Sequence, residues 1–137
     1  MRFVQKIALV FGFAFVGAAI FGFAIGGMSM DAHMETAPRL VGLFPVNAIH
    51  NALHLAFGAW GLLGARSVNG ARRYCFFSGA AYLVLAALGF VFPDTFGFIP
   101  IGGNDIALHG VFGVMLTTVG AMASAEVESP ASAAAGR

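Results

Sequence analysis

The sequence predicts an all-α membrane protein, a four-transmembrane-helix bundle made of two duplicated helical hairpins. Three observations predict it: an apolar composition, four long apolar segments and an internal repeat. Of the 137 residues, 59% are hydrophobic and only 9% are charged, whereas an average soluble domain has about 25% charged residues. So few charges cannot keep the surface of a soluble monomer in water, which excludes that class. The formal net charge of +1 also excludes nucleic acid as a partner, because nucleic-acid binding needs clustered basic residues.

Four segments meet the length and polarity requirements of membrane spans. A span needs about 20 mainly apolar residues to cross about 30 Å of hydrocarbon. Four segments meet this requirement and contain no Lys, Arg or Glu, namely residues 7–27, 46–63, 74–92 and 106–123. Backbone groups in lipid must be hydrogen-bonded within the segment, so each segment is predicted to be a helix. We therefore expect one four-helix transmembrane domain over residues 1–123.

The first segment also has features of a signal peptide, because Arg2 and Lys6 precede an apolar run that ends in small residues. The apolar region of a signal peptide is about 7 to 15 residues long, and residues 7–27 exceed that length. We therefore interpret the first segment as a retained helix.

The distribution of basic residues predicts the orientation, because Lys and Arg are enriched in short cytoplasmic loops. One side of the membrane receives five basic residues, namely Arg2, Lys6, Arg66, Arg72 and Arg73, and the other side receives Arg39. Both termini should then be cytoplasmic. The loops with Asp31, His33, Glu35 and Asp94 should face outward. The tail over residues 124–137 is small, polar and interrupted by Pro130, which predicts a disordered cytoplasmic end.

The chain matches itself at an offset of 55 residues. GLFPVNAIHNALHLAFG, which starts at Gly42, aligns without gaps with GFIPIGGNDIALHGVFG, which starts at Gly97, and seven of the 17 positions are identical. The first and third segments match less well, and their alignment needs a gap of about a dozen residues. Two hairpins in the same orientation predict a pseudo-two-fold axis along the membrane normal.

Polar and small residues form a stripe on the second and fourth segments. Spacings of three and four place residues on one helical face. On the second segment that face carries Asn47, His50, Asn51, His54, Gly58, Gly61 and Ala65. On the fourth it carries Asp105, His109, Gly113, Thr117 and Gly120. Small and hydrogen-bonding residues favour helix contacts in membranes, so the two stripes should face each other or the interior, with Asn104 or Asp105 as the cap of the fourth helix.

The histidines of this stripe allow two interpretations. In the first, they belong to a hydrogen-bonded polar network in which Asn47, Asn51 and Asn104 satisfy the ring nitrogens and the two helices are in close contact. In the second, the set forms a metal site, because histidines four residues apart can reach one ion and three His with one Asp suit zinc or copper. The metal ligands would be His50, His54, Asp105 and His109.

Other chemistries have weaker signals. In a haem variant, His54 and His109 would be axial ligands and Gly58 and Gly113 would leave room for the ring. A proton or solute path is a further alternative, and so is a Cu(I) site in the loop that contains Met28, Met30, His33 and Met34. Ser78 has no His at helical spacing, and Cys75 lies away from every His in the predicted topology, so we predict no catalytic residues.

Three stretches resemble a known family: LFPVNAIHNALHLAFGAWGLLGARS, ARRYCFFSGAAYLVLAALGF and FGFIPIGGNDIALHGVFGV. They are similar to the bacterial membrane family named domain of unknown function 4383. The most specific motifs are F-P-V-N-x-x-H-N-x-x-H, from Phe44 to His54, and G-G-N-D-x-x-x-H, from Gly102 to His109. The resemblance implies a four-helix bacterial membrane protein and supplies no reaction.

We therefore expect a non-catalytic structural or accessory subunit of the bacterial cytoplasmic membrane, in contact with the lipid bilayer and with a membrane-protein partner or a second copy. Gly22 and Gly26 form a G-x-x-x-G pattern for such packing. No cofactor is expected in this interpretation. The alternative is a metal- or haem-binding redox protein that uses the histidines of the second and fourth segments.

Overall fold

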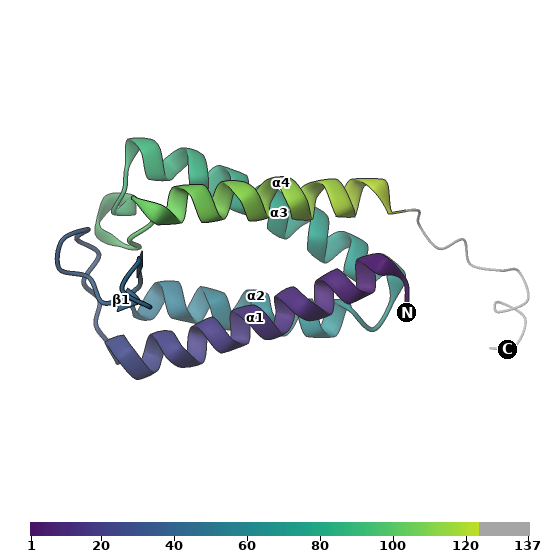
Figure 1. Cartoon of the computed structure of the whole chain (residues 1–137), viewed down its shortest axis with the longest axis horizontal. Helices are drawn as coiled ribbons and strands as arrows, with labels where there is room; N and C mark the ends of the chain where they lie inside the picture. Colours follow the sequence, from purple (N-terminus) through teal and green to yellow (C-terminus); the bar gives the residue numbers. More distant parts are fainter. Residues whose placement is uncertain (124–137) are drawn as a thin grey trace, which may run out of the picture.

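The computed structural model describes residues 1–123, and within them it is helical. Four long helices lie side by side (Figure 1): α1 (Phe3–Gly26), α2 (Ala48–Gly64), α3 (Val68–Val91) and α4 (Asn104–Met122). A short 3-10 helix, η1 (Thr95–Gly97), lies between α3 and α4. The prediction of a disordered tail concerns residues 124–137, which lie outside the described residues.

Three of the helices described in residues 1–123, α1, α3 and α4, are long and apolar enough to cross a membrane. Their outward side chains include large exposed apolar groups such as Phe13, Phe21, Val84 and Val114, which a soluble protein rarely gathers on one surface. The chain is therefore an integral membrane protein. α2 is shorter, with 17 residues, which corresponds to about 26 Å of helix.

Three helices, α1, α3 and α4, begin earlier than the apolar segments indicated. α3 begins at Val68, after Ser67, whose Oγ accepts a hydrogen bond from the backbone N of Gly70 at 2.9 Å. Arg72 and Arg73 consequently lie on α3 and not in a loop, since a helix continues through polar residues once its first turn is capped. For α4 the predicted side-chain cap is wrong. Gly103, with φ of 63°, precedes the helix, and no side chain caps it.

The α1–α2 connection contains a feature that the all-α prediction did not include. Two short strands, β1 (Arg39–Leu40) and β2 (Phe44–Pro45), pair antiparallel. Nearby, Asp31 accepts a hydrogen bond from the backbone N of His33 at 2.9 Å. A hydrogen bond from the Thr36 side chain, together with this one, lowers the pKa of the Asp31 carboxyl below its usual value. Local hydrogen bonds therefore order this loop.

The helices pack as two antiparallel hairpins, α1 with α2 and α3 with α4, which form two layers in Figure 1. Glycines make the closest approaches inside each hairpin. A Cβ on Gly58 would lie 2.8 Å from the backbone N of Val16 in α1, and one on Gly113 would lie 2.9 Å from the backbone N of Leu83 in α3. The small-residue stripes of α2 and α4 thus face their own hairpin partners.

The predicted close contact between α2 and α4 is wrong. Between the hairpins, the packed helix pairs are α2 with α3 and α1 with α3. Glycines let two helix backbones approach closely. Here the glycines of α2 and α4 already contact α1 and α3, their partners within the hairpins. The layers are instead separated by side chains of a buried cluster that includes Val4, Phe11, Tyr74 and Leu116.

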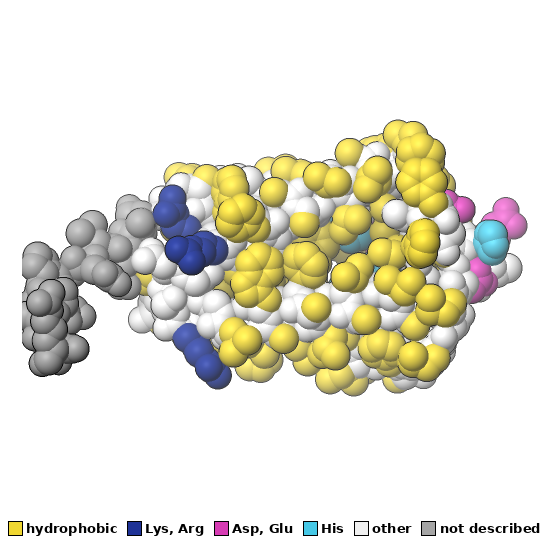
Figure 2. Space-filling model, turned by 180° about the vertical axis from the view of Figure 1, so that it is seen from behind, with side chains coloured by type: hydrophobic (Ala, Val, Ile, Leu, Met, Phe, Trp, Pro, Cys, Tyr) yellow, Lys and Arg dark blue, Asp and Glu magenta, His cyan; other side chains and the backbone are white. Residues whose placement is uncertain are grey.

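Charged side chains gather at the two ends of the molecule. Figure 2 shows Lys and Arg at one end and Asp, Glu and His at the other, with apolar side chains between them. The basic end contains the start of α1 and the α2–α3 connection, and the opposite end contains the two longer connections. The polar residues of α2 and α4 lie toward this second end, because both helices begin there.

Candidate functional site

The candidate site forms where α2 and α4 begin, and Asn47 sets the geometry of α2. The Asn47 Oδ1 accepts a hydrogen bond from the backbone N of His50 at 2.9 Å, which caps the helix. Its Nδ2 donates to the carbonyl of Phe98 at 2.8 Å, in the loop before α4. Asn47 is 1% exposed. One buried side chain thus ties the start of α2 to the opposite hairpin.

Three histidine rings and two aromatic rings stack in the interior. The His50 ring centroid lies 4.5 Å from that of His54 and 5.9 Å from that of His109. Phe15 stacks on His54 at 5.9 Å, and Tyr82 stacks on His109 at 5.0 Å. Phe15 and Tyr82 stack on each other at 5.4 Å. We call these five residues the ring layer, and it takes at least one side chain from each of the four helices.

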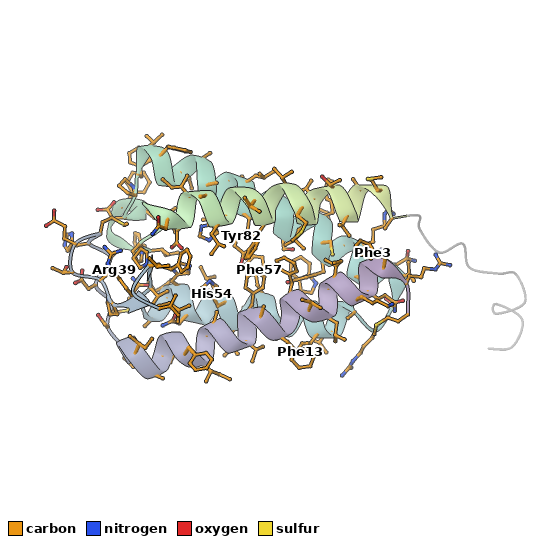
Figure 3. The ribbon with its side chains drawn as sticks, viewed as in Figure 1. Phe3, Phe13, Arg39, His54, Phe57 and Tyr82 are labelled. Carbon is orange, nitrogen blue, oxygen red and sulfur yellow. The ribbon has the colours of Figure 1, made fainter. Side chains whose placement is uncertain are left out.

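The ring layer lies between the two hairpins. In Figure 3, His54 and Tyr82 point toward each other across the space between the layers of helices, and Phe57 lies beside them. His50 and His109 are 4% and 3% exposed. The His50 ring also lies beside the backbone carbonyls of Pro45 and Pro100. The side chains that carry the chemistry are thus inside the protein and not on its lipid-facing surface.

Several polar atoms around the ring layer have no hydrogen-bond partner among the described residues. They are the Nδ1 atoms of His50, His54 and His109 and the Oδ2 atom of Asp105. Both side-chain atoms of Asn51 share this property. A buried polar atom without a partner costs about 1 to 3 kcal/mol. Such a concentration of these atoms is unusual in an interior and marks the site.

The asparagines do not satisfy the histidine rings, contrary to the prediction. Asn47 bonds backbone groups, as described above. Asn104 is on the exposed end of α4 and donates to the carbonyl of Leu43 at 3.3 Å. Asn51 is fully buried against Gly22, where a Cβ would lie 2.0 Å from its Oδ1. Asn47 and Asn104 bond groups of a cap and of loops, and spacing on a helix could not reveal that.

The four predicted metal ligands, His50, His54, Asp105 and His109, all line one cavity of about 110 Å³. Within residues 1–123, however, no three His, Cys, Asp or Glu side chains are arranged to hold one metal ion. The haem variant relied on Gly58 and Gly113 to make room for a porphyrin. Both glycines lie instead against the backbone of a neighbouring helix, so they leave no such room.

The potential nucleophiles lie away from the ring layer. The Ser78 hydroxyl donates to the backbone carbonyl of Tyr74 in its own helix. Cys75 is fully buried, and its Sγ lies 4.0 Å from the carbonyl of Val4. Both residues therefore pack or bond the backbone and have no base beside them.

Sequence reasoning missed Phe15 and Tyr82, which complete the ring layer. These two residues lie on the first and third apolar segments, which match each other only across a gap. The signal that would have found them is their equivalence under that gapped alignment, since each is followed along its helix by a small residue four positions later, Ala19 and Ala86.

A family model described as a domain of unknown function, DUF4383, matches residues 5–122, which is most of the chain. No curated protein and no solved structure matches the chain.

Proposed function

This chain belongs to the DUF4383 family, and from that membership we propose that it is a four-span, non-catalytic accessory protein of the bacterial cytoplasmic membrane, built from two duplicated hairpins joined by the ring layer. Its surroundings are the lipid bilayer and either a membrane-protein partner or a second copy of the chain. The observation that carries the proposal is the ring layer itself, in which side chains that elsewhere do chemistry are stacked as packing groups.

The case for a fourth span rests on how α2 packs. α2 is antiparallel to α1: Gly12 meets Leu62, and Gly22 meets Asn51. A helix that lies along a membrane-spanning neighbour for its whole length crosses the same layer. The exposed side chains of α2 include Leu55, Trp60 and Leu63, which suit lipid. A span that is a few ångström short costs only fractions of a kcal/mol per ångström.

Glycine contacts support the duplication. In the first hairpin, Gly12 meets Leu62 and Gly58 meets Val16; in the second, Gly79 meets Thr117 and Gly113 meets Leu83. A single offset in residue number relates Gly12 and Val16 of α1 to Gly79 and Leu83 of α3. The offset of 55 residues found in the sequence carries the α2 members onto the α4 members.

The buried positions of α1 and α3 also correspond under this offset. The offset that carries Gly12 to Gly79 takes each buried residue of α1 to a buried residue of α3. It also carries Phe15 to Tyr82, while the second offset carries His54 to His109. The two stacked pairs of the ring layer are therefore equivalent, and His50, which corresponds to Asp105, breaks the symmetry.

The proposed orientation puts both termini and the basic end in the cytoplasm. Replacement of an exposed residue by cysteine in a Cys75→Ala background tests it. We expect Glu35→Cys to react with a membrane-impermeant maleimide in intact spheroplasts, and Arg66→Cys to react only after the membrane is permeabilised. Labelling of both positions in intact spheroplasts, or the reverse pattern, would overturn the orientation.

The structural role of the ring layer predicts that an apolar ring can replace an imidazole. We expect His109→Phe to change the free energy of unfolding by no more than about 1 kcal/mol, because phenyl keeps the stack on Tyr82 and removes an unpartnered nitrogen. Thermal unfolding of the protein in mild detergent measures this.

The detergent-solubilised protein also tests the alternative function, a metal- or haem-binding redox protein, which the unpartnered ring nitrogens favour. Metal analysis and an absorption spectrum of the wild type are expected to show neither stoichiometric metal nor a Soret band. If metal or haem is present and His109→Phe loses it, the histidines are ligands and the structural proposal is wrong.

A test of the accessory role is purification of the wild-type chain from its native membrane. We expect one stoichiometric membrane protein, or a second copy of the chain, to be retained. Gly22 and Gly26 are not available for that contact, since Gly22 lies against Asn51 and a Cβ on Gly26 would lie 3.1 Å from Pro38. Recovery of a monomer alone would count against an accessory role.

A further inference from the structure

A cavity of about 110 Å³ lies beside the ring layer, between α1, α4 and the end of the α1–α2 connection. Ala14, Ala18 and Phe15 line it from α1, and Leu108 and Phe112 line it from α4. α1 and α4 are not a closely packed helix pair, and Phe112 of α4 bridges them by contacting the rings of Phe11 and Phe15. An engineered protein cavity of about 150 Å³ takes up benzene, so this space is of the size of a small ring.

Polar residues are among those that line this mostly apolar space. His50 and His109 line it, as does Asp105, which is 2% exposed. The Nδ1 atoms of the two histidines and the Oδ2 atom of the aspartate are among the buried atoms without a partner. A mostly apolar pocket with a few converging polar groups is the usual form of a small-molecule site.

A second, equivalent cavity lies between α2 and α3 and is smaller. Its volume is about 30 Å³. Its lining corresponds to that of the first cavity under the two offsets: Ala81 and Tyr82 replace Ala14 and Phe15, and Leu53 replaces Leu108. The difference is Leu85, which occupies the position equivalent to Ala18. The fold therefore tolerates a leucine at this position, and the alanine leaves one of the two spaces larger.

We propose that the cavity between α1 and α4 binds a small, membrane-soluble ring compound that carries a hydroxyl group, of the phenol type. The lining includes the aromatic side chains of Phe15, Tyr82 and Phe112, which suit a ring compound. A hydroxyl both donates and accepts, so it bonds the carboxyl oxygen of Asp105 and an imidazole nitrogen in either protonation state. Delivery of the compound from the lipid rests on the proposed membrane arrangement of the chain, whereas the cavity itself does not.

The test uses 4-fluorophenol as the probe and the full chain in detergent micelles, with fluorine NMR as the readout. We expect a saturable bound resonance with the wild type. Fluorobenzene lacks the hydroxyl and should bind at least tenfold more weakly, which corresponds to about 1.4 kcal/mol. Ala18→Leu should lose the bound resonance, because it reproduces the lining of the smaller cavity between α2 and α3.

A complementary variant covers the case in which Ala18→Leu does not fold. Leu85→Ala should enlarge the second cavity and add a second bound resonance while the first is kept. If the wild type gives no saturable resonance, the cavity holds water or nothing and the proposal is wrong. An unchanged resonance in a folded Ala18→Leu variant would place the probe elsewhere. Neither result bears on the topology, which the cysteine labelling tests separately.

Discussion

Gly79→Ala is expected to destabilise the protein by about 3 kcal/mol. A Cβ on Gly79 would lie 2.3 Å from the backbone N of Thr117 and 2.9 Å from the carbonyl of Gly113. Both atoms belong to the backbone of α4, so they cannot move away as a flexible side chain does. α3 and α4 must separate to admit the methyl group. The measurement is thermal unfolding of the detergent-solubilised variant followed by circular dichroism.

The matched control is Gly110→Ala, in which a Cβ would have no atom within 4 Å. Since alanine is favoured over glycine in a helix by about 1 kcal/mol, this variant should unfold at the same temperature as the wild type or a higher one. Equal losses in Tm for the two variants would show that the hairpin does not depend on the close approach of α3 and α4.

Asn47→Ala is expected to lower the free energy of unfolding by about 2 to 4 kcal/mol. The loss combines a helix cap, which contributes about 1 kcal/mol, with a buried hydrogen bond whose loss leaves the Phe98 carbonyl without its donor, at a cost of about 1 to 3 kcal/mol. Because that bond joins α2 to the α3–α4 loop, the variant should also loosen the ring layer. Thermal unfolding and hydrogen exchange at the first turn of α2 measure the two effects.

Two asparagine variants separate these contributions. Asn47→Asp keeps an oxygen that accepts from the backbone N of His50 but has no Nδ2 donor, so its stability should lie between those of the wild type and Asn47→Ala. Asn104→Ala removes an exposed hydrogen bond and should change the stability by no more than about 0.5 kcal/mol. If it matches Asn47→Ala, the assigned role of Asn47 is wrong.

The helices themselves were predictable, apart from their ends. Apolar windows located all four, since a long apolar run in a chain with so few charges has no other environment in which to fold. They missed the first turns of α1 and α3, where Lys6, Arg72 and Arg73 continue the helix. A charge ends an apolar window, but it does not end a helix, because the backbone hydrogen bonds continue through it.

The site was predictable in part. The repeat and the helical spacing selected His50, His54, Asp105 and His109, and all four line the same cavity. The partners of their rings were not predicted. Stacking on Phe15 and Tyr82 depends on α1 and α3, and an apolar aromatic residue on such a helix gives no signal that separates an interior ring from a lipid-facing one.

By itself, the sequence determined that this chain is a helical membrane protein of the DUF4383 family and which polar residues share a helical face, because composition and periodicity are local properties. Only the tertiary structure decided what each face meets. Glycines allow α1 to approach α2 and α3 to approach α4 most closely, so the small faces of α2 and α4 close the hairpins, and the larger rings remain in the space between the layers. Which surfaces can approach most closely depends on all the side chains at the contact together, and no single segment contains that information.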